Sequence, residues 1–219
     1  MRELLSFAAI NSIYLALIAG VFQLLRKRVN KAQKVFLGFV VYSILLEYLN
    51  SYCVDVLRNN VWLMDTGFTL EFIFFIFYYK SFVGLETKEL MVYQVIATVL
   101  LIILSLRYLI LKSHLSINYL MPVVIITSVV LCASVVLKIF DATDTEFHRN
   151  PIFWISFAKI FYLMMILPFN VFRYLKPFID PETSNFYYRT DELINYVANI
   201  VLNPLFAYSF LCRKSLSSS

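Results

Sequence analysis

Apolar residues run in long, almost uninterrupted stretches along the whole chain, and short polar connections separate them. A helix that crosses about 30 Å of hydrocarbon needs roughly 20 residues, and seven stretches are long enough. They lie at about 4–25, 35–56, 61–82, 90–111, 118–140, 152–174 and 190–212. Their residues are apolar at successive positions instead of alternating, which predicts membrane-crossing helices and excludes a membrane β-barrel.

Composition supports the same class. Of the 219 residues, 61% are hydrophobic and 15% are charged, and the mean hydropathy is +0.76. A soluble core of this size cannot hide so much apolar surface from water. We therefore expect an all-α polytopic membrane bundle of seven transmembrane helices, in which residues 1–219 form a single domain with the lipid bilayer as its solvent.

Basic residues predict the orientation of this bundle. They crowd the connection between the first two stretches, at Arg26, Lys27, Arg28, Lys31 and Lys34. Because cytoplasmic loops carry an excess of Lys and Arg, this connection is expected in the cytoplasm. Seven crossings then place the N-terminus outside and the C-terminus in the cytoplasm. The formal charge of +5 is thereby explained without a nucleic-acid partner.

The segment "KPFIDPETSNFYYRTDE", residues 176–192, is an exception among the short connections. Its two prolines and its acidic residues predict an ordered external loop between the last two crossings. We interpret it as a solvated turn, with a lid over the bundle as the alternative.

Three ionisable residues fall inside the predicted spans, although a charge at mid-membrane costs about 2.5 to 3.5 kcal/mol on insertion scales. Glu47 and Glu71 lie at similar depth in the second and third spans, and Lys159 lies in the sixth. Such groups normally face the interior of a bundle and pair with one another. Lys159 is the expected partner of the carboxylates if its helix neighbours the second or third.

Other polar residues recur at helical spacing on the same segments and extend this group into a polar belt. The belt is expected to bind a ligand or ion, or to form an internal network. Besides the three ionisable residues, its predicted members are Asn11, Asn50, Tyr162, Asn195, Asn199 and Asn203.

Two interpretations of the belt remain open. Two carboxylates near one ammonium leave one excess negative charge, so a proton or a cation is an expected occupant. Alternatively, Glu47, Glu71 and Lys159 form a structural network that only fixes the register of the helices, with the asparagines as further contacts between helices.

Two short motifs resemble those of known membrane proteins. Seven crossings with an outside N-terminus resemble rhodopsins and G-protein-coupled receptors in topology, but "NPLFAY" carries one residue too many for the receptor signature. The segments "NNVWLMDTGFTLEFIFFIF" and "YVANIVLNPLFAYSFLCRKS" look like small seven-helix membrane proteins of Bacteroidota. This resemblance implies a multi-pass protein of the bacterial inner membrane and implies no activity.

These observations favour a sensor or transporter that responds to a small polar molecule, an ion or a proton, and a sensor would act through a membrane partner protein. The alternative is a non-catalytic assembly subunit or an oligomeric pore built from copies of the chain. An intramembrane acid/base enzyme comes third.

We expect no enzyme activity, because the predicted spans lack histidine and a GxSxG motif. The spacing of Cys53, Cys132 and Cys212 matches no zinc or redox motif, so no metal or other cofactor is expected.

Overall fold

The computed structural model describes residues 2–57, 61–106, 121–143, 146–175 and 181–212. This part of the chain is helical, which confirms the predicted all-α class. Its α-helices are α1 (Arg2–Leu25), α2 (Lys31–Tyr52), α3 (Val61–Val83), α4 (Thr87–Leu106), α5 (Met121–Thr143), α6 (Pro151–Leu175) and α7 (Pro181–Leu211). A π-helical turn, Cys53–Leu57, continues α2, and a 3-10 turn, Phe147–Arg149, precedes α6.

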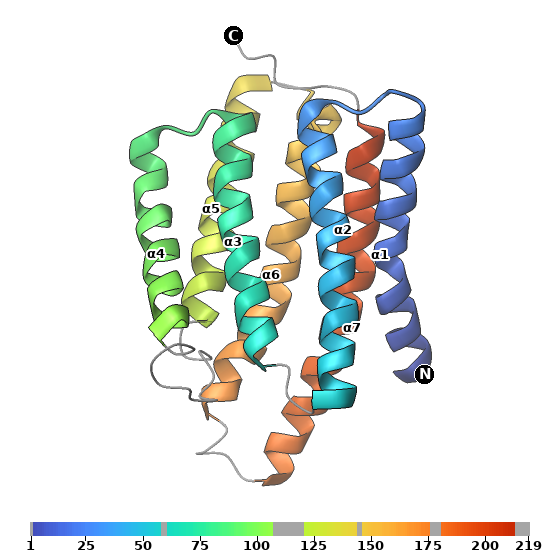
Figure 1. Ribbon diagram of the computed structural model, residues 1–219, viewed down its shortest axis with the longest axis vertical. Helices are drawn as coiled ribbons and strands as arrows, with labels where there is room; N and C mark the ends of the chain where they lie inside the picture. Colours follow the sequence, from blue (N-terminus) through green and yellow to red (C-terminus); the bar gives the residue numbers. More distant parts are fainter. Residues whose placement is uncertain (1, 58–60, 107–120, 144–145, 176–180, 213–219) are drawn as a thin grey trace.

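Within the described residues, 6 helical segments are long and apolar enough to cross a membrane. They are Arg2–Leu25, Lys31–Val56, Lys88–Leu106, Met121–Ala142, Pro151–Val171 and Arg189–Leu211. The remaining helix, α3, has 23 residues and runs alongside the others (Figure 1). The chain therefore has the helical make-up of a multi-pass membrane protein, and the seventh crossing stays a prediction.

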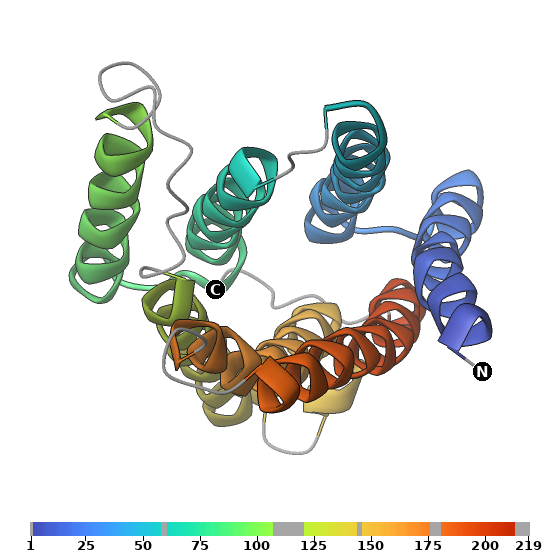
Figure 2. The same ribbon diagram turned by 90° about the horizontal axis from the view of Figure 1, so that it is seen from below.

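The helices form two layers (Figure 2). Helices α4, α3, α2 and α1 follow one another along one side, and α5, α6 and α7 form the other. Helix α7 lies in extensive contact with both α1 and α6, and α5 packs on α6. Helices α2 and α3 contact each other less closely and face α6 and α7 across the interior.

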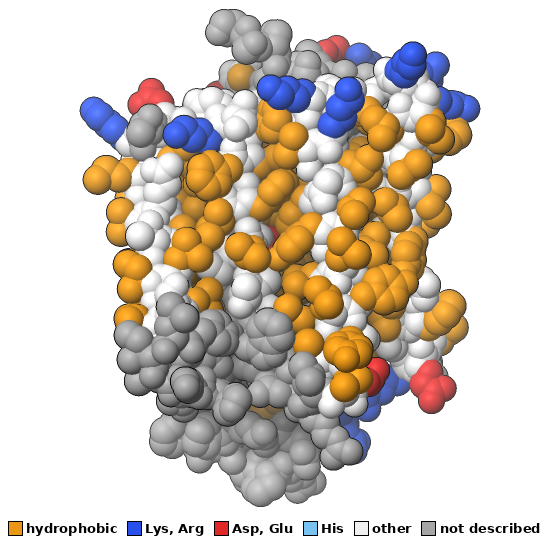
Figure 3. Space-filling view, viewed as in Figure 1, with side chains coloured by type: hydrophobic (Ala, Val, Ile, Leu, Met, Phe, Trp, Pro, Cys, Tyr) orange, Lys and Arg blue, Asp and Glu red, His pale blue; other side chains and the backbone are white. Residues whose placement is uncertain are grey.

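The outer surface is apolar over most of its height. Large hydrophobic side chains are exposed on it, among them Leu4, Phe7 and Leu25, the last 77% exposed. Figure 3 shows Lys and Arg side chains along the upper edge, above this apolar band. Lys31 and Lys34, which follow the connection between α1 and α2, are exposed at this edge. An apolar band below a basic rim is typical of a bundle that lies in a bilayer.

The last helix begins earlier than predicted. Helix α7 starts at Pro181 and not near residue 190, so the prediction of a loop over 176–192 is wrong from residue 181 onward. Proline suits the first position of a helix, because its φ is already helical and the N–H that it lacks would have no partner there. Residues 176–180 lie outside the described part of the chain.

Arg2, at the start of α1, forms an ion pair with Glu192 of α7.

Aromatic rings fill the end of the bundle near the basic rim. Phe36 lies 4.9 Å from Phe206 and Phe39 lies 4.6 Å from Phe74, measured between ring centroids. Tyr78 also packs against Phe36. These residues lie early in α2 and late in α3 and α7, so they gather at one end of the bundle. Such offset and edge-to-face contacts stabilise a core beyond the area that they bury.

A buried glutamine joins the start of α2 to the end of α7 in this region. The amide Nε2 of Gln33 donates to the carbonyl oxygens of Ser209 at 2.8 Å and Cys212 at 2.9 Å. Its Oε1 accepts from the backbone N–H of Asn30, which in turn caps α2 through its own side chain. Gln33 thus caps the start of α2 and the end of α7 together, and satisfies carbonyls that a helix terminus leaves without partners.

We expect the substitution Gly20→Val to lower the free energy of unfolding by about 1–3 kcal/mol. A Cβ atom at Gly20 would lie 2.5 Å from Cδ1 of Leu37 and 3.2 Å from Cζ of Phe210, so α1 approaches its neighbours closely there. Gly38→Val is the matched control, because no atom lies within 4 Å of the corresponding Cβ. Detergent-based thermal unfolding measures both variants, and equal losses would contradict the close packing at Gly20.

Candidate functional site

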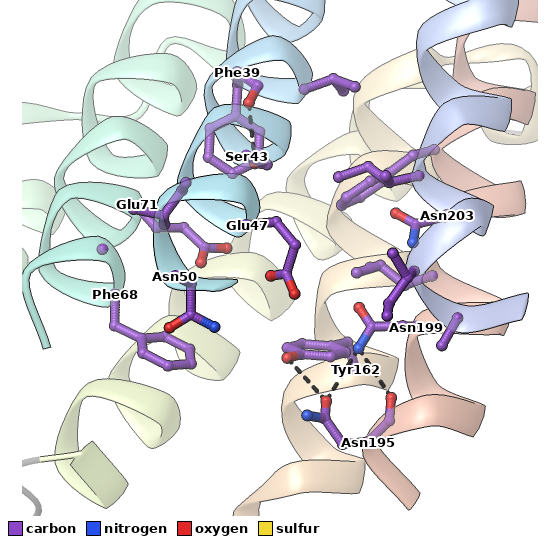
Figure 4. Close-up of a pocket in the computed structure, with 18 of the residues that line it drawn as sticks. Phe39, Ser43, Glu47, Asn50, Phe68, Glu71, Tyr162, Asn195, Asn199 and Asn203 are labelled. Atoms are coloured by element: carbon purple, nitrogen blue, oxygen red, sulfur yellow. Dashed lines mark hydrogen bonds between the residues drawn. The ribbon is translucent and has the colours of Figure 1, made fainter. Parts of the chain in front are cut away.

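A cavity of about 330 Å³ lies in the interior between α1, α2, α3, α6 and α7. All predicted members of the polar belt except Asn11 line it. Figure 4 shows Glu47 and Glu71 on one side of this space, and Asn195, Asn199 and Asn203 on the other. The fold therefore gathers side chains that are more than 100 residues apart in sequence into one site. Helices α4 and α5 contribute no lining residue.

The cavity is closed at one end and accessible at the other. Toward the basic rim its walls are Phe39, Val40 and Phe206, all buried, with Val40 only 1% exposed. Toward the end where α1 begins, the lining residues Met64 and Asn195 are exposed. The orientation predicted from the basic residues would place this accessible end outside the cell.

Lys159 and Glu71 form an ion pair at the wall of the cavity. Nζ of Lys159 donates to Oε1 of Glu71 and so links α6 to α3. Both side chains line the cavity, and the lysine is the more buried of the two, at 6% exposed against 21% for the glutamate. The ammonium also lies 5.2 Å from the ring centroid of Tyr162, within reach of a cation–π contact.

Glu47, unlike Glu71, forms no ion pair with any residue that the structure describes. Its carboxylate is exposed to the cavity and, within the described part of the chain, makes no hydrogen bond or ion pair. Figure 4 shows it pointing from α2 into the open space toward Tyr162 and Asn199. Gly67 explains how α2 and α3 bring their carboxylates to the same space: Leu46 of α2 packs into the position that a Cβ at Gly67 would occupy, 2.6 Å away.

Three side chains of α6 and α7 form a connected row across the cavity. Nδ2 of Asn199 donates to the backbone oxygen of Asn195 at 2.9 Å and to its Oδ1 at 3.1 Å. The hydroxyl of Tyr162 donates to the same Oδ1 at 3.4 Å, which joins α6 to the asparagines of α7. This row keeps both asparagines on the wall of the cavity (Figure 4).

The first helix contributes a different polar residue from the one predicted. Asn11 is exposed, donates to the carbonyl of Phe7 in its own helix and lies outside the cavity. The inward residue is its neighbour Ser12, which is buried and accepts a hydrogen bond of 2.8 Å from Nδ2 of Asn203. Ser12 donates in turn to the carbonyl of Ala9 at 2.6 Å. The placement of Asn11 in the belt is therefore wrong by one helix position, or about 100° of rotation.

We expect Ser12→Ala to cost about 1–3 kcal/mol of stability, because it leaves the buried amide of Asn203 without an acceptor. Asn11→Ala is the matched control on the adjacent position and should change the free energy of unfolding by less than about 0.5 kcal/mol. Thermal unfolding of both variants in the same detergent provides the comparison. A larger loss from Asn11→Ala would contradict the register of α1 described here.

Sequence reasoning did not identify the apolar walls of the site. The rings of Phe39, Phe68 and Tyr196 line the cavity together with the polar residues. Their signal is indistinguishable in sequence from that of the many other aromatic residues that pack in the core or face lipid. Only Tyr196 has a local indication, since it directly follows Asn195 and lies three residues, or almost one helical turn, before Asn199.

The remaining chemistry of the site is simple. No group of three or more His, Cys, Asp or Glu in the described residues is placed to hold a metal ion. Cys53, Cys132 and Cys212 are buried and free. Comparisons with protein-family models, with curated proteins and with solved structures find no match to this chain. The geometry of the cavity is consequently the basis for a functional hypothesis.

Proposed function

We propose that this multi-pass membrane protein binds a small polar molecule in the cavity and acts as a sensor or transporter for it. The observation that carries the proposal is a space of about 330 Å³ in an otherwise apolar bundle, lined by Glu47, which has no hydrogen-bond or ion-pair partner among the residues that the structure describes. Small-molecule sites are concave, largely apolar and furnished with a few convergent polar groups, and their volumes begin near 300 Å³. This cavity meets each of these criteria.

The polar groups argue against a role confined to holding helices together. A structural network satisfies its buried polar groups within the protein, since a group left without a partner costs free energy. The Lys159–Glu71 pair fits that description. Glu47 does not, because it projects into the cavity from α2 and forms no hydrogen bond or ion pair with another helix in the described part of the chain.

Access from one end favours sensing over transport as the working hypothesis. A sensor needs a site that opens to the compartment it samples, whereas a transporter exposes its site to both sides in turn. The aromatic rings at Phe36, Phe39 and Phe206 separate the cavity from the basic rim. Transport would require these rings to separate. The closed layer that they form therefore favours a site that a ligand reaches from one side only.

The experiment that tests this function is a thermal-unfolding screen of the protein in detergent, with a panel of small polar compounds divided equally among cations, neutral molecules and anions. A ligand that binds the folded state raises the unfolding temperature by mass action. We expect at least one compound to stabilise the protein and to lose its effect in Ser43→Phe, which places a ring in the cavity.

Leu45→Phe is the matched control, because Leu45 is exposed on the opposite side of the same helix and does not line the cavity. This variant should respond to the same compounds as the unmodified protein. The proposal would be overturned if no compound in the panel stabilised the protein, or if stabilisation persisted unchanged in Ser43→Phe.

A further inference from the structure

Most side-chain hydrogen-bond donors described at the cavity are committed to protein acceptors, with Nδ2 of Asn195 as an exception, since the Oδ1 of that amide accepts from Asn199 and Tyr162. Nδ2 of Asn199 donates to a backbone carbonyl, which fixes the orientation of that amide. Nδ2 of Asn203 donates to Ser12, whose own proton is used on the carbonyl of Ala9, so this amide is fixed as well. The hydroxyl of Ser43 donates to the carbonyl of Phe39 in its own helix.

Several acceptors are left over by the same contacts. With their Nδ2 atoms engaged, Asn199 and Asn203 each retain an Oδ1 that receives no hydrogen bond within the described part of the chain. Both carboxylate oxygens of Glu47 add to this set. Figure 4 shows the oxygens of Asn199 and Asn203 directed toward the side of the cavity where Glu47 lies. The site therefore presents an excess of acceptors and suits a ligand that carries several N–H donors.

The charge of the lining points in the same direction. Lys159 and Glu71 neutralise each other, so an ionised Glu47 is the one carboxylate of the lining whose charge no ion pair in the described residues balances. A charge in a low-dielectric space gains most from a counter-charge close by, and a charge-assisted hydrogen bond to a carboxylate is about twice as strong as a neutral one. One positive charge on the ligand would balance the cavity.

The size and the walls of the cavity favour an organic cation over a metal ion. At about 30 Å³ per water molecule, a volume of about 330 Å³ holds roughly ten molecules of that size, which is far more than one ion needs. Aromatic rings from Phe39, Phe68 and Tyr162 complete the wall. Such rings attract ammonium and guanidinium groups through their faces and pack against the carbon skeleton of a ligand.

We infer that the cavity takes a compact organic monocation, an ammonium or guanidinium ion of roughly ten non-hydrogen atoms, with Glu47 as its counter-ion and the oxygens of Asn199 and Asn203 as further acceptors. This inference rests on the proposed binding function and names the chemical class of its ligand.

The test uses three compounds of nearly equal shape and different charge: tyramine, which is a cation, tyrosol, which is neutral, and 4-hydroxyphenylacetate, which is an anion. Their dissociation constants are measured from the shift in thermal unfolding of the full chain in detergent. We expect tyramine to bind at least about tenfold more tightly than either of the others, as one charge-assisted hydrogen bond predicts.

Two glutamine variants locate the effect. Glu47→Gln keeps the shape of the side chain and removes its charge, so it should weaken tyramine binding about tenfold or more and abolish the preference for the cation. Glu3→Gln is the matched control, since Glu3 is exposed at the same end of the bundle and lies outside the cavity. It should bind tyramine as the unmodified protein does.

If tyrosol or 4-hydroxyphenylacetate binds as tightly as tyramine, the cavity accepts small molecules without selecting cations. The inference is then overturned and the proposed function stands. A preference for tyramine that survives Glu47→Gln overturns the inference in the same way. If none of the three compounds binds, the inference also falls, and the wider panel described above decides whether the proposed function falls with it.

Discussion

The substitution Glu71→Leu should lower the free energy of unfolding by about 3–5 kcal/mol, the usual cost of removing one partner from a buried ion pair. Lys159 is almost fully buried and loses with Glu71 its only carboxylate partner in the described residues. The rings that remain near it cannot replace an ion pair, because a cation–π contact contributes about 0.5–2 kcal/mol. Reversible unfolding in mixed SDS micelles, followed by circular dichroism, measures the loss.

Glu47→Leu provides the control for this experiment, since it removes the same side chain from the same cavity. Glu47 has no partner to leave behind within the described residues, so its replacement should change stability by less than about 1 kcal/mol. A further check is Lys159→Met, which should cost less than Glu71→Leu because the carboxylate that it strands still borders the cavity. Equal costs for Glu71→Leu and Glu47→Leu would show that the ion pair contributes nothing to the fold.

Gln33→Met should destabilise the protein by about 2–4 kcal/mol, although the two side chains are similar in volume. The substitution removes two hydrogen bonds to the carbonyls of Ser209 and Cys212 and one from the N–H of Asn30, each with a net value of about 1 kcal/mol. Because these bonds hold the end of α7, we also expect Cys212 to become accessible to a thiol reagent. The measurement uses a background in which Cys53 and Cys132 are replaced by alanine.

Lys34→Met is the corresponding control, as Lys34 is the next residue on α2 and its side chain is exposed. It should leave both the stability and the labelling rate of Cys212 unchanged. If Gln33→Met lowered stability without raising the labelling rate, the end of α7 would be held by packing alone, and the role assigned to the glutamine would be wrong.

The sequence predicted the helical class and most helix positions, because long apolar stretches report directly on burial in lipid. The same signal failed at the start of α7. Hydropathy marks the part of a helix that lies in hydrocarbon, and residues 181–189 continue the helix with polar side chains that carry no such mark. The predicted ends near residues 111 and 118 fall outside the described residues.

All side chains predicted for the polar belt except Asn11 line one cavity, but the sequence did not show which of them pair with one another. The positions of Glu47, Glu71 and Lys159 within the apolar stretches predicted that they meet in the bundle interior, because charged side chains are disfavoured in lipid. The sequence could not show which carboxylate pairs with the lysine, because that depends on which helices are neighbours. It also could not separate Asn11 from Ser12, as both are polar and a single residue of register decides which one faces α7.

The length of α7 has a mechanical consequence. Its 31 residues span about 46 Å at 1.5 Å per residue, so one helix passes from the accessible end of the bundle to the basic rim. Near its middle it carries Asn195 and Asn199, and its last carbonyls are held by Gln33. Pro204 lies between the asparagines and the end that Gln33 holds, and an internal proline removes one backbone hydrogen bond of the helix. A ligand that displaces the asparagines would therefore tilt the first part of α7 about Pro204, while Gln33 keeps the last carbonyls of the helix in place, about 20 Å from Asn195.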